Sequence, residues 1–178
     1  MRGEELKIFG AMGPNSGLVA LPGAHTKWAS VRDGRIERFA TYMSGEIGML
    51  LKSNSLVGKL IPAQSPDNPE AFLRGVKLAR DPRVGGNILR RVFSARSLVL
   101  CEELPPAHIS DYLSGLMIGA EINEVIEEYN SPDKPVTLIG ASALCQRYSM
   151  ALLEAGMTST VADNAGIAAF QALRLSHS

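Results

Sequence analysis

The residues best suited to chemistry lie in the segment 22–27, whose sequence is Pro-Gly-Ala-His-Thr-Lys. An apolar run at 18–21 precedes it, which predicts a turn directly after a short buried strand. In that position successive backbone N–H groups, the Thr26 hydroxyl and the Lys27 ammonium can point at a phosphate. An ordinary β-turn that leads into a hairpin fits the same residues. The candidate phosphate-binding residues are Gly23, Ala24, His25, Thr26 and Lys27.

A second candidate, Gly140-Ala141-Ser142, lies between an apolar run at 136–139 and a helical pattern. Ligands of open α/β sheets bind at the carboxyl ends of strands, and a helix N-terminus favours anions. The competing interpretation is a plain helix start that the Ser142 side chain caps. The chain contains neither Gly-x-Gly-x-x-Gly nor Gly-x-x-x-x-Gly-Lys-Ser/Thr, so the two common nucleotide fingerprints add no support.

Glu4 and Glu5 open a predicted helix, and either could supply a carboxylate that accepts a proton. Glu46 opens another helix, directly after Ser44 and Gly45. Acidic residues in a first helical turn also interact favourably with the helix dipole, and that interpretation requires no active site. His25 is the only histidine near a candidate site, so an unrelated α/β enzyme that works through His25 is a further alternative.

The composition is that of a globular, uncharged domain. Of the 178 residues, 46% are apolar and 20% charged, with 18 Lys and Arg against 18 Asp and Glu. The sequence has no stripe of Lys and Arg residues, which a nucleic-acid-binding protein would normally show. No apolar run approaches the roughly 20 residues that cross a bilayer, and the first residues do not resemble a signal peptide, so we expect a cytoplasmic protein without a membrane partner. Cys101 and Cys145 lack metal-ligand spacing, and we expect two packed, free thiols and no bound metal.

The elements that must position these residues alternate between strands and helices, which predicts a single α/β domain without an internal boundary. Asp33-Gly34 predicts a tight hairpin turn, and Asn68-Pro69 predicts a capped helix start. Ser44 is the expected cap of the helix at 45–53. The expected strands are 18–21, 26–31, 36–42, 136–139 and 159–161. The expected helices are 4–12, 45–53, 69–80, 87–101, 109–129, 144–155 and 164–175.

Several segments, taken in order, resemble signatures of the 2-dehydro-3-deoxygalactonokinases, and together they extend over nearly the whole chain. The segments are 1–5, 21–28, 43–46, 112–121, 136–140 and 168–172. One such segment alone is a weak signal, but several in the family's order are specific. Where the family reads Pro-Gly-Thr-His, this chain has Ala24, which leaves backbone N–H groups and Thr26 as donors.

The resemblance implies ATP-dependent phosphorylation of 2-dehydro-3-deoxy-galactonate, with Mg²⁺, in galactose and galactonate breakdown. It also implies an actin/hexokinase-like (ribonuclease H-like) fold, of which residues 1–178 would form the C-terminal lobe. By this likeness the turn 22–27 meets the outer phosphates, and Gly140, Ala141 and Ser142 lie against the adenosine. Gly45 and Glu46 lie near the nucleotide, and Glu4 deprotonates the attacking hydroxyl, with Glu5 as its competitor.

Chains of that family are much longer, and the resemblance implies that an N-terminal lobe with an Asp-x-Gly phosphate loop is absent here. Two hypotheses follow. The chain is an enzyme lobe that turns over only with the missing lobe, or it is a non-catalytic module that binds nucleotide or associates with itself. Nucleotide binding and turnover assays distinguish the two hypotheses.

Overall fold

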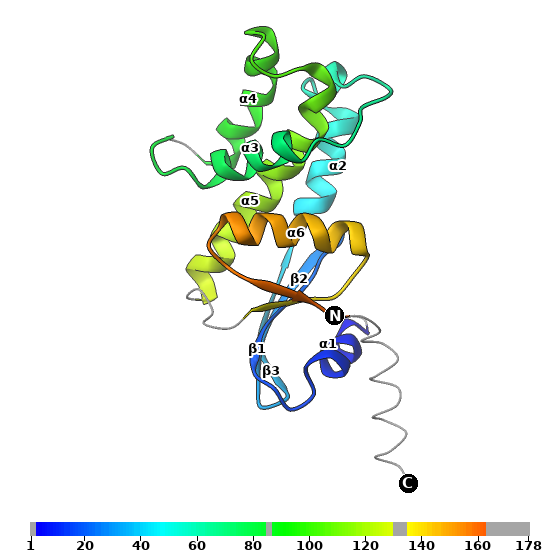
Figure 1. The fold of residues 1–178 in the computed structure, drawn as a ribbon, viewed down its shortest axis with the longest axis vertical. Helices are drawn as coiled ribbons and strands as arrows, with labels where there is room; N and C mark the ends of the chain where they lie inside the picture. Colours follow the sequence, from blue (N-terminus) through cyan, green and yellow to red (C-terminus); the bar gives the residue numbers. More distant parts are fainter. Residues whose placement is uncertain (1–2, 85–86, 130–134, 163–178) are drawn as a thin grey trace. The chain divides into compact units, whose positions relative to one another are not determined.

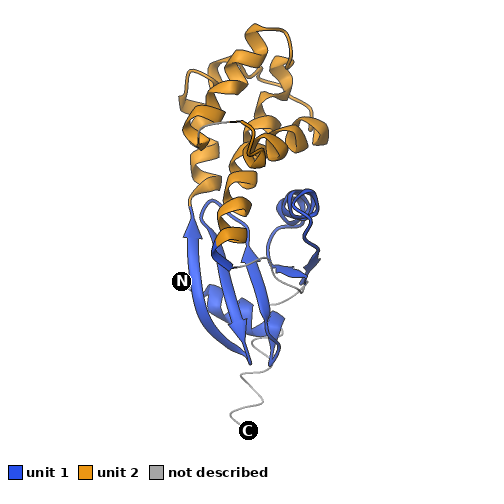
Figure 2. Ribbon diagram, turned by 90° about the vertical axis from the view of Figure 1, so that its left-hand side faces the viewer, with its two compact units in different colours: residues 1–42, 128–178 blue, residues 43–127 orange. Residues whose placement is uncertain are grey.

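The computed structural model describes residues 3–84, 87–129 and 135–162 (Figure 1). The chain divides into two compact units, coloured separately in Figure 2. Unit 1 comprises Met1–Tyr42 and Glu128–Ser178, and unit 2 comprises Met43–Glu127. The sequence patterns indicated no boundary, because no linker marks either junction. One long helix, α5 (Ile109–Tyr129), runs through the second of them.

Unit 1 is built on a mixed five-stranded sheet with the order β3-β2-β1-β4-β5. β1 (Gly17–Leu21), β2 (Thr26–Arg32) and β3 (Arg35–Tyr42) form an antiparallel meander. β4 (Val136–Leu138) pairs parallel to β1, and β5 (Ser159–Val161) pairs parallel to β4. All five strands were predicted from the sequence, with differences of one residue at some of their ends.

The hairpin between β2 and β3 confirms the predicted turn at Asp33-Gly34. Both residues have positive φ angles, 49° and 72°, as a two-residue turn of this type requires. Gly34 is needed here for a second reason, since a Cβ on it would lie 2.9 Å from the Gly13 carbonyl oxygen. The turn therefore fixes the pairing of β2 with β3, which begins with Arg32 opposite Arg35.

The two faces of this sheet are covered by different helices, because side chains alternate along each strand. Ala29 and Val31 pack with Ile8 and Met12 of α1 (Glu4–Met12). Trp28, which points the other way, lies with its ring centroid 6.5 Å from that of Tyr148 on α6 (Ser142–Glu154). The α1 helix was predicted from the sequence, and its buried residues are Ile8 and Met12.

Unit 2 is helical, and most of its helices begin and end as predicted. They are α2 (Ser44–Asn54), α3 (Pro69–Arg80), α4 (Ile88–Leu100) and α5, with short 3₁₀ turns at Gly58–Leu60 and Pro106–His108. Asn68 caps α3 as expected, because its side-chain oxygen accepts a hydrogen bond of 2.7 Å from the Ala71 N–H. The predicted helix at 164–175 lies outside the described residues.

Helices α3 and α5 approach each other closely through glycines. A Cβ on Gly115 would collide with the Phe72 carbonyl oxygen, and one on Gly75 with the Tyr112 carbonyl oxygen. Gly119 is equally tight, since a Cβ there would lie 2.9 Å from the Val76 Cα. The two backbones can come this near only because these positions have no side chain.

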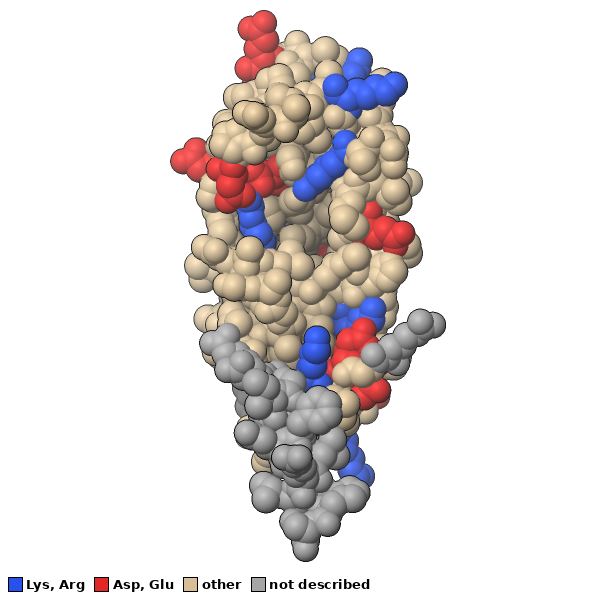
Figure 3. Space-filling model, turned by 90° about the vertical axis from the view of Figure 1, so that its right-hand side faces the viewer, with Lys and Arg blue, Asp and Glu red and all other residues tan. Residues whose placement is uncertain are grey.

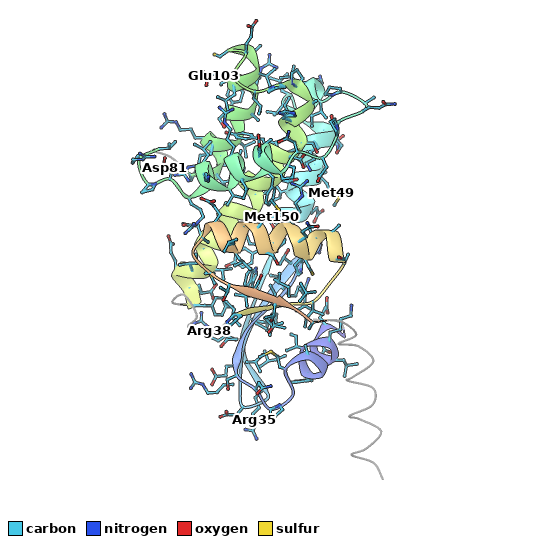
Figure 4. All side chains as sticks on the ribbon, viewed as in Figure 1. Arg35, Arg38, Met49, Asp81, Glu103 and Met150 are labelled. Carbon is cyan, nitrogen blue, oxygen red and sulfur yellow. The ribbon has the colours of Figure 1, made fainter. Side chains whose placement is uncertain are left out.

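The C-terminal end of α3 is closed by Arg91, whose guanidinium donates to the carbonyl oxygens of Ala79, Asp81 and Val84. Basic side chains commonly satisfy the last carbonyls of a helix in this way. Asp81 itself, labelled in Figure 4, accepts hydrogen bonds from the Arg83 guanidinium. These bonds hold the pKa of the Asp81 carboxyl at about 2, so this carboxyl remains ionised.

Two sequence predictions about single side chains were wrong. Ser44 does not cap α2 but is its first residue, and its hydroxyl donates to the buried carboxylate of Glu121. The need of a buried carboxylate for a donor explains this arrangement. Cys101 and Cys145 are both free thiols, as expected, but only Cys145 is packed inside, whereas Cys101 is exposed.

Candidate functional site

The turn 22–27 is held together from inside by Thr26, which is fully buried at the start of β2. The Thr26 hydroxyl donates to the Gly23 carbonyl oxygen at 3.3 Å and accepts from the Gly23 N–H at 3.4 Å. It also makes a hydrogen bond of 2.8 Å with the Tyr148 hydroxyl of α6. The hydroxyl that the sequence offered as a phosphate donor is thus used within the protein.

The outer part of the same turn is open. Ala24 and His25 are exposed at its tip. A Cβ on Gly23 would have no atom nearer than the His25 backbone at 4.0 Å, so the space beside this backbone is clear. The Lys27 side chain folds back on the turn, where its ammonium donates a hydrogen bond of 3.0 Å to the His25 carbonyl oxygen. The tip therefore presents backbone groups and one cation.

The segment 140–142 forms the connection between β4 and α6 and is exposed. Ser142 was considered as the helix cap, but Ala141 occupies the cap position and no side chain caps the helix. The Ala141 carbonyl accepts from the N–H groups of Leu144 and Cys145, at 3.0 and 2.9 Å. The start of α6 has no side-chain cap, so its first backbone N–H groups could bind an anion.

The structure brings these two turns together. β1 and β4 are neighbouring parallel strands, with Ala20 opposite Leu138, so their carboxyl ends meet at one edge of the sheet. The chain continues from these ends into the two turns. Gly140 passes so close to Pro22 that a Cβ on it would lie 3.4 Å from the Pro22 carbonyl oxygen. The side-by-side placement follows directly from the parallel pairing.

Glu4 lies at the start of α1, and its carboxylate is 4.0 Å from the Lys27 ammonium. Both side chains are mostly buried, with 30% of Glu4 and 15% of Lys27 exposed. Glu5 has a different partner, since its carboxylate accepts a hydrogen bond of 3.1 Å from the Gly3 N–H. Of the two acidic candidates, Glu4 is therefore the one beside the turn 22–27, and Glu5 serves the start of its own helix.

Gly45 and Glu46 lie in the first turn of α2. They belong to unit 2, whereas both turns and Glu4 belong to unit 1. The group that the structure assembles in unit 1 thus contains every candidate residue except these two.

Tyr148 was the residue that sequence reasoning missed. It is 1% exposed, and its hydroxyl forms a hydrogen bond with Thr26. The one available signal was general, because a buried tyrosine needs a hydrogen-bond partner for its hydroxyl. The sequence does not show which residue that partner is.

The described residues contain no group of three or more His, Cys, Asp or Glu side chains that could hold a metal ion. Within the same part of the chain, every helix is too short or too polar to cross a membrane. On the face drawn in Figure 3, side chains of both charges are interspersed among wide uncharged areas.

The chain is similar to curated proteins that are considerably longer. It is 35% identical over 174 residues to the 2-dehydro-3-deoxygalactonokinase of Escherichia coli (strain K12), which covers 97% of this chain and 57% of that relative. It is 32% identical over 169 residues to a protein given the same name in Rhizobium meliloti (strain 1021), with 92% and 54% covered. The chain thus spans a little over half the length of these relatives.

Solved structures show the same relationship. A crystal structure of a protein assigned as a 2-dehydro-3-deoxygalactonokinase from Sinorhizobium meliloti matches 99% of this chain and 60% of its own, with a TM-score of 0.85 at 30% identity. The structure of a protein assigned as an N-acetylglucosamine kinase from Porphyromonas gingivalis matches 97% of this chain and 65% of its own at a TM-score of 0.51, and at 17% identity it shows a likeness of fold alone. A family profile described as 2-keto-3-deoxy-galactonokinase matches residues 1–174, and with these relatives it shows that the chain belongs to that family.

Proposed function

We propose that this chain holds the nucleotide and supplies the base in an ATP-dependent kinase that phosphorylates 2-dehydro-3-deoxy-galactonate. The observation that carries the proposal is the placement of the turns 22–27 and 140–142 side by side, with Glu4 and Lys27 at the first of them. Family membership supports the reaction class, since the curated relatives are named as kinases of this sugar acid.

The turn 22–27 fits the outer phosphates of ATP. Its tip is exposed, the space beside Gly23 is clear and the Lys27 ammonium lies over it. Backbone N–H groups and one cation are the donors that phosphoryl groups need, and phosphoryl transfer depends mainly on positioning and charge neutralisation. Thr26 contributes by holding these groups in place from below, and Mg²⁺ bound to the phosphates would neutralise further negative charge.

The segment 140–142 fits the other part of the nucleotide. Gly140, Ala141 and Ser142 would lie against the adenosine, and Gly140 lies beside Pro22 of the other turn. The distance between the two turns then decides how well a nucleotide meets both at once.

Glu4 would take the proton of the attacking hydroxyl of the sugar acid. A base must lie within hydrogen-bond reach of that hydroxyl, and Glu4 is the acidic residue beside the phosphate turn. Its carboxylate lies 4.0 Å from the Lys27 ammonium, beside the turn proposed to hold the outer phosphates. Glu5 is less suited, because the Gly3 N–H already occupies its carboxylate.

In this proposal the chain is the C-terminal lobe of an actin/hexokinase-like kinase, acts in the cytoplasm, and works together with an N-terminal lobe. The chain covers 57% and 54% of the two curated relatives, which supports a division of the site between lobes. The alternative is a non-catalytic module that binds nucleotide or associates with itself, and the same coverage is the observation that favours it.

The first prediction concerns binding and turnover by the chain alone. Calorimetry is expected to show weak ATP-Mg binding, with a dissociation constant of about 1 mM, and weaker adenosine binding. A coupled assay of ADP release is expected to show no turnover with 2-dehydro-3-deoxy-galactonate. No binding at several millimolar ATP-Mg would overturn the proposed nucleotide site, and sustained turnover would overturn the requirement for a second lobe.

The second prediction concerns Ala24, which stands where the family has threonine. Ala24→Thr is expected to tighten ATP-Mg binding about fivefold, because it places a hydroxyl donor at the exposed tip of the phosphate turn. Ala24→Val has nearly the same shape without the hydroxyl and serves as the matched control. Equal effects of both variants, or no effect of either, would show that the tip does not contact phosphate.

A further inference from the structure

The hydrogen bond between Thr26 and Tyr148 links the two turns of the candidate site through the protein interior. Thr26 is the last residue but one of the turn 22–27 and has no exposed surface. Its hydroxyl bonds to the Gly23 carbonyl oxygen at 3.3 Å and to the Tyr148 hydroxyl at 2.8 Å, and either hydroxyl can be the donor in the second bond. A buried bond of this kind is directional and excludes water.

Tyr148 is itself fixed on its helix. It is 1% exposed, and its ring lies against Trp28, which is fully buried in β2. The helix that carries it, α6, begins at Ser142, within the second turn of the site. Tyr148 follows Ser142 by less than two helical turns, on a backbone that hardly changes its length. Any shift of α6 along its axis is therefore transmitted to Thr26.

We propose that Tyr148 is a positioning residue, whose hydroxyl sets the spacing between the phosphate turn and the start of α6. The assignment rests on the proposed nucleotide site. The hydroxyl does not face the nucleotide, since it lies buried on Thr26. It instead holds the turn 22–27 in place relative to α6, whose first residue, Ser142, belongs to segment 140–142. The ligand class concerned is a nucleoside polyphosphate, because adenosine alone would meet only one turn.

Tyr148→Phe removes this link and leaves the ring in place. We expect the affinity of the chain for ATP-Mg to fall about fivefold and its affinity for adenosine to stay within about twofold. Thr26→Val should have the same effect, whereas Thr26→Ser keeps the hydroxyl and should retain most of the ATP affinity. Calorimetry with each ligand gives the two affinities, and their ratio is the readout.

The chain offers a matched control in Tyr112, which is also 1% exposed and whose hydroxyl makes a bond of 2.7 Å with Ser94. Tyr112→Phe removes an equivalent buried hydroxyl pair from unit 2. It should lower the melting temperature as much as Tyr148→Phe does, while the ratio of ATP to adenosine affinity stays that of the unsubstituted chain.

The outcomes distinguish a failure of the positioning role of Tyr148 from a failure of the nucleotide site itself. If the unsubstituted chain binds ATP-Mg more tightly than adenosine but Tyr148→Phe weakens both equally, or neither, the positioning role is wrong and the nucleotide site stands. If the unsubstituted chain binds neither ligand, the nucleotide site is wrong and the role of Tyr148 falls with it. A loss of ATP-Mg affinity alone in Tyr148→Phe and in Thr26→Val, with the affinity retained in Thr26→Ser, supports both.

Discussion

Gly115→Ala is expected to lower the free energy of unfolding of unit 2 by about 3 kcal/mol. The added methyl group would collide with the Phe72 carbonyl oxygen and crowd the Val76 N–H on α3. Both are backbone groups in a regular helix, so neither can rotate away, and the two helices would have to move apart. Urea unfolding followed by circular dichroism measures the change, provided that the transition stays two-state.

Gly48→Ala provides the matched control in the same unit. Gly48 lies inside α2, and a Cβ on it would make ordinary contact with the Met117 side chain at 3.7 Å. Here alanine should stabilise the chain by about 1 kcal/mol, through its higher helix propensity. Effects of the same sign and size at both positions would show that the crossing of α3 and α5 is looser than described.

Lys27→Met is expected to weaken ATP-Mg binding about tenfold and to leave adenosine binding unchanged. The ammonium is the one cation that the described structure places over the turn 22–27, and charge-assisted contacts to phosphate are stronger than neutral ones. Lys7→Met removes the same charge from an exposed position of α1 and should change the affinity less than twofold. A comparable loss in both variants would indicate a general charge effect instead of a contact.

Removing the charge of Glu4, which lies beside Lys27, should change the ATP-Mg affinity in the opposite direction. Glu4→Gln is expected to tighten ATP-Mg binding about twofold, because it removes a negative charge 4.0 Å from Lys27. In a preparation extended to the length of the curated relatives, the same change should slow ADP release about 10²- to 10⁴-fold. Glu5→Gln should affect neither quantity, and a slow Glu5→Gln enzyme beside an active Glu4→Gln enzyme would reverse the assignment.

The elements of this fold were predictable where short-range chemistry decides them. Asp33-Gly34 allows positive φ at two successive residues, and Asn68-Pro69 combines a cap with a preset φ angle. Each signal lies within a few residues, so the sequence displays it. The apolar spacing of α5 likewise extends over a helix of 21 residues.

The sequence could not show the interactions between residues that lie far apart in the chain. Ser44 resembles a cap in every local respect, but the buried Glu121 carboxylate needs a donor and takes its hydroxyl. The boundary of the units was hidden because α5 continues through it. The glycines of α3 and α5 were visible as residues, yet their purpose depends on which two helices touch.

In the candidate site, too, the local features could be predicted from the sequence and the long-range contacts could not. The two turns were found from their residue types, and their roles as phosphate and adenosine contacts stay predictions. Their adjacency depends on β1 pairing with β4, which periodicity alone does not reveal. The choice between Glu4 and Glu5 also needed the structure, because both carboxylates open the same helical turn and only their partners differ.

The split of unit 1 along the chain has a consequence for how the protein emerges from the ribosome. β1 is synthesised before unit 2, but its neighbour β4 follows only after all of unit 2 has been made. During that interval the nascent hairpin has one strand with unpaired N–H and C=O groups, and closing the long loop to β4 carries an entropic cost. Unit 2, which is continuous and rich in local contacts, should be complete first, and the adjacency of the two turns should be among the last features to form.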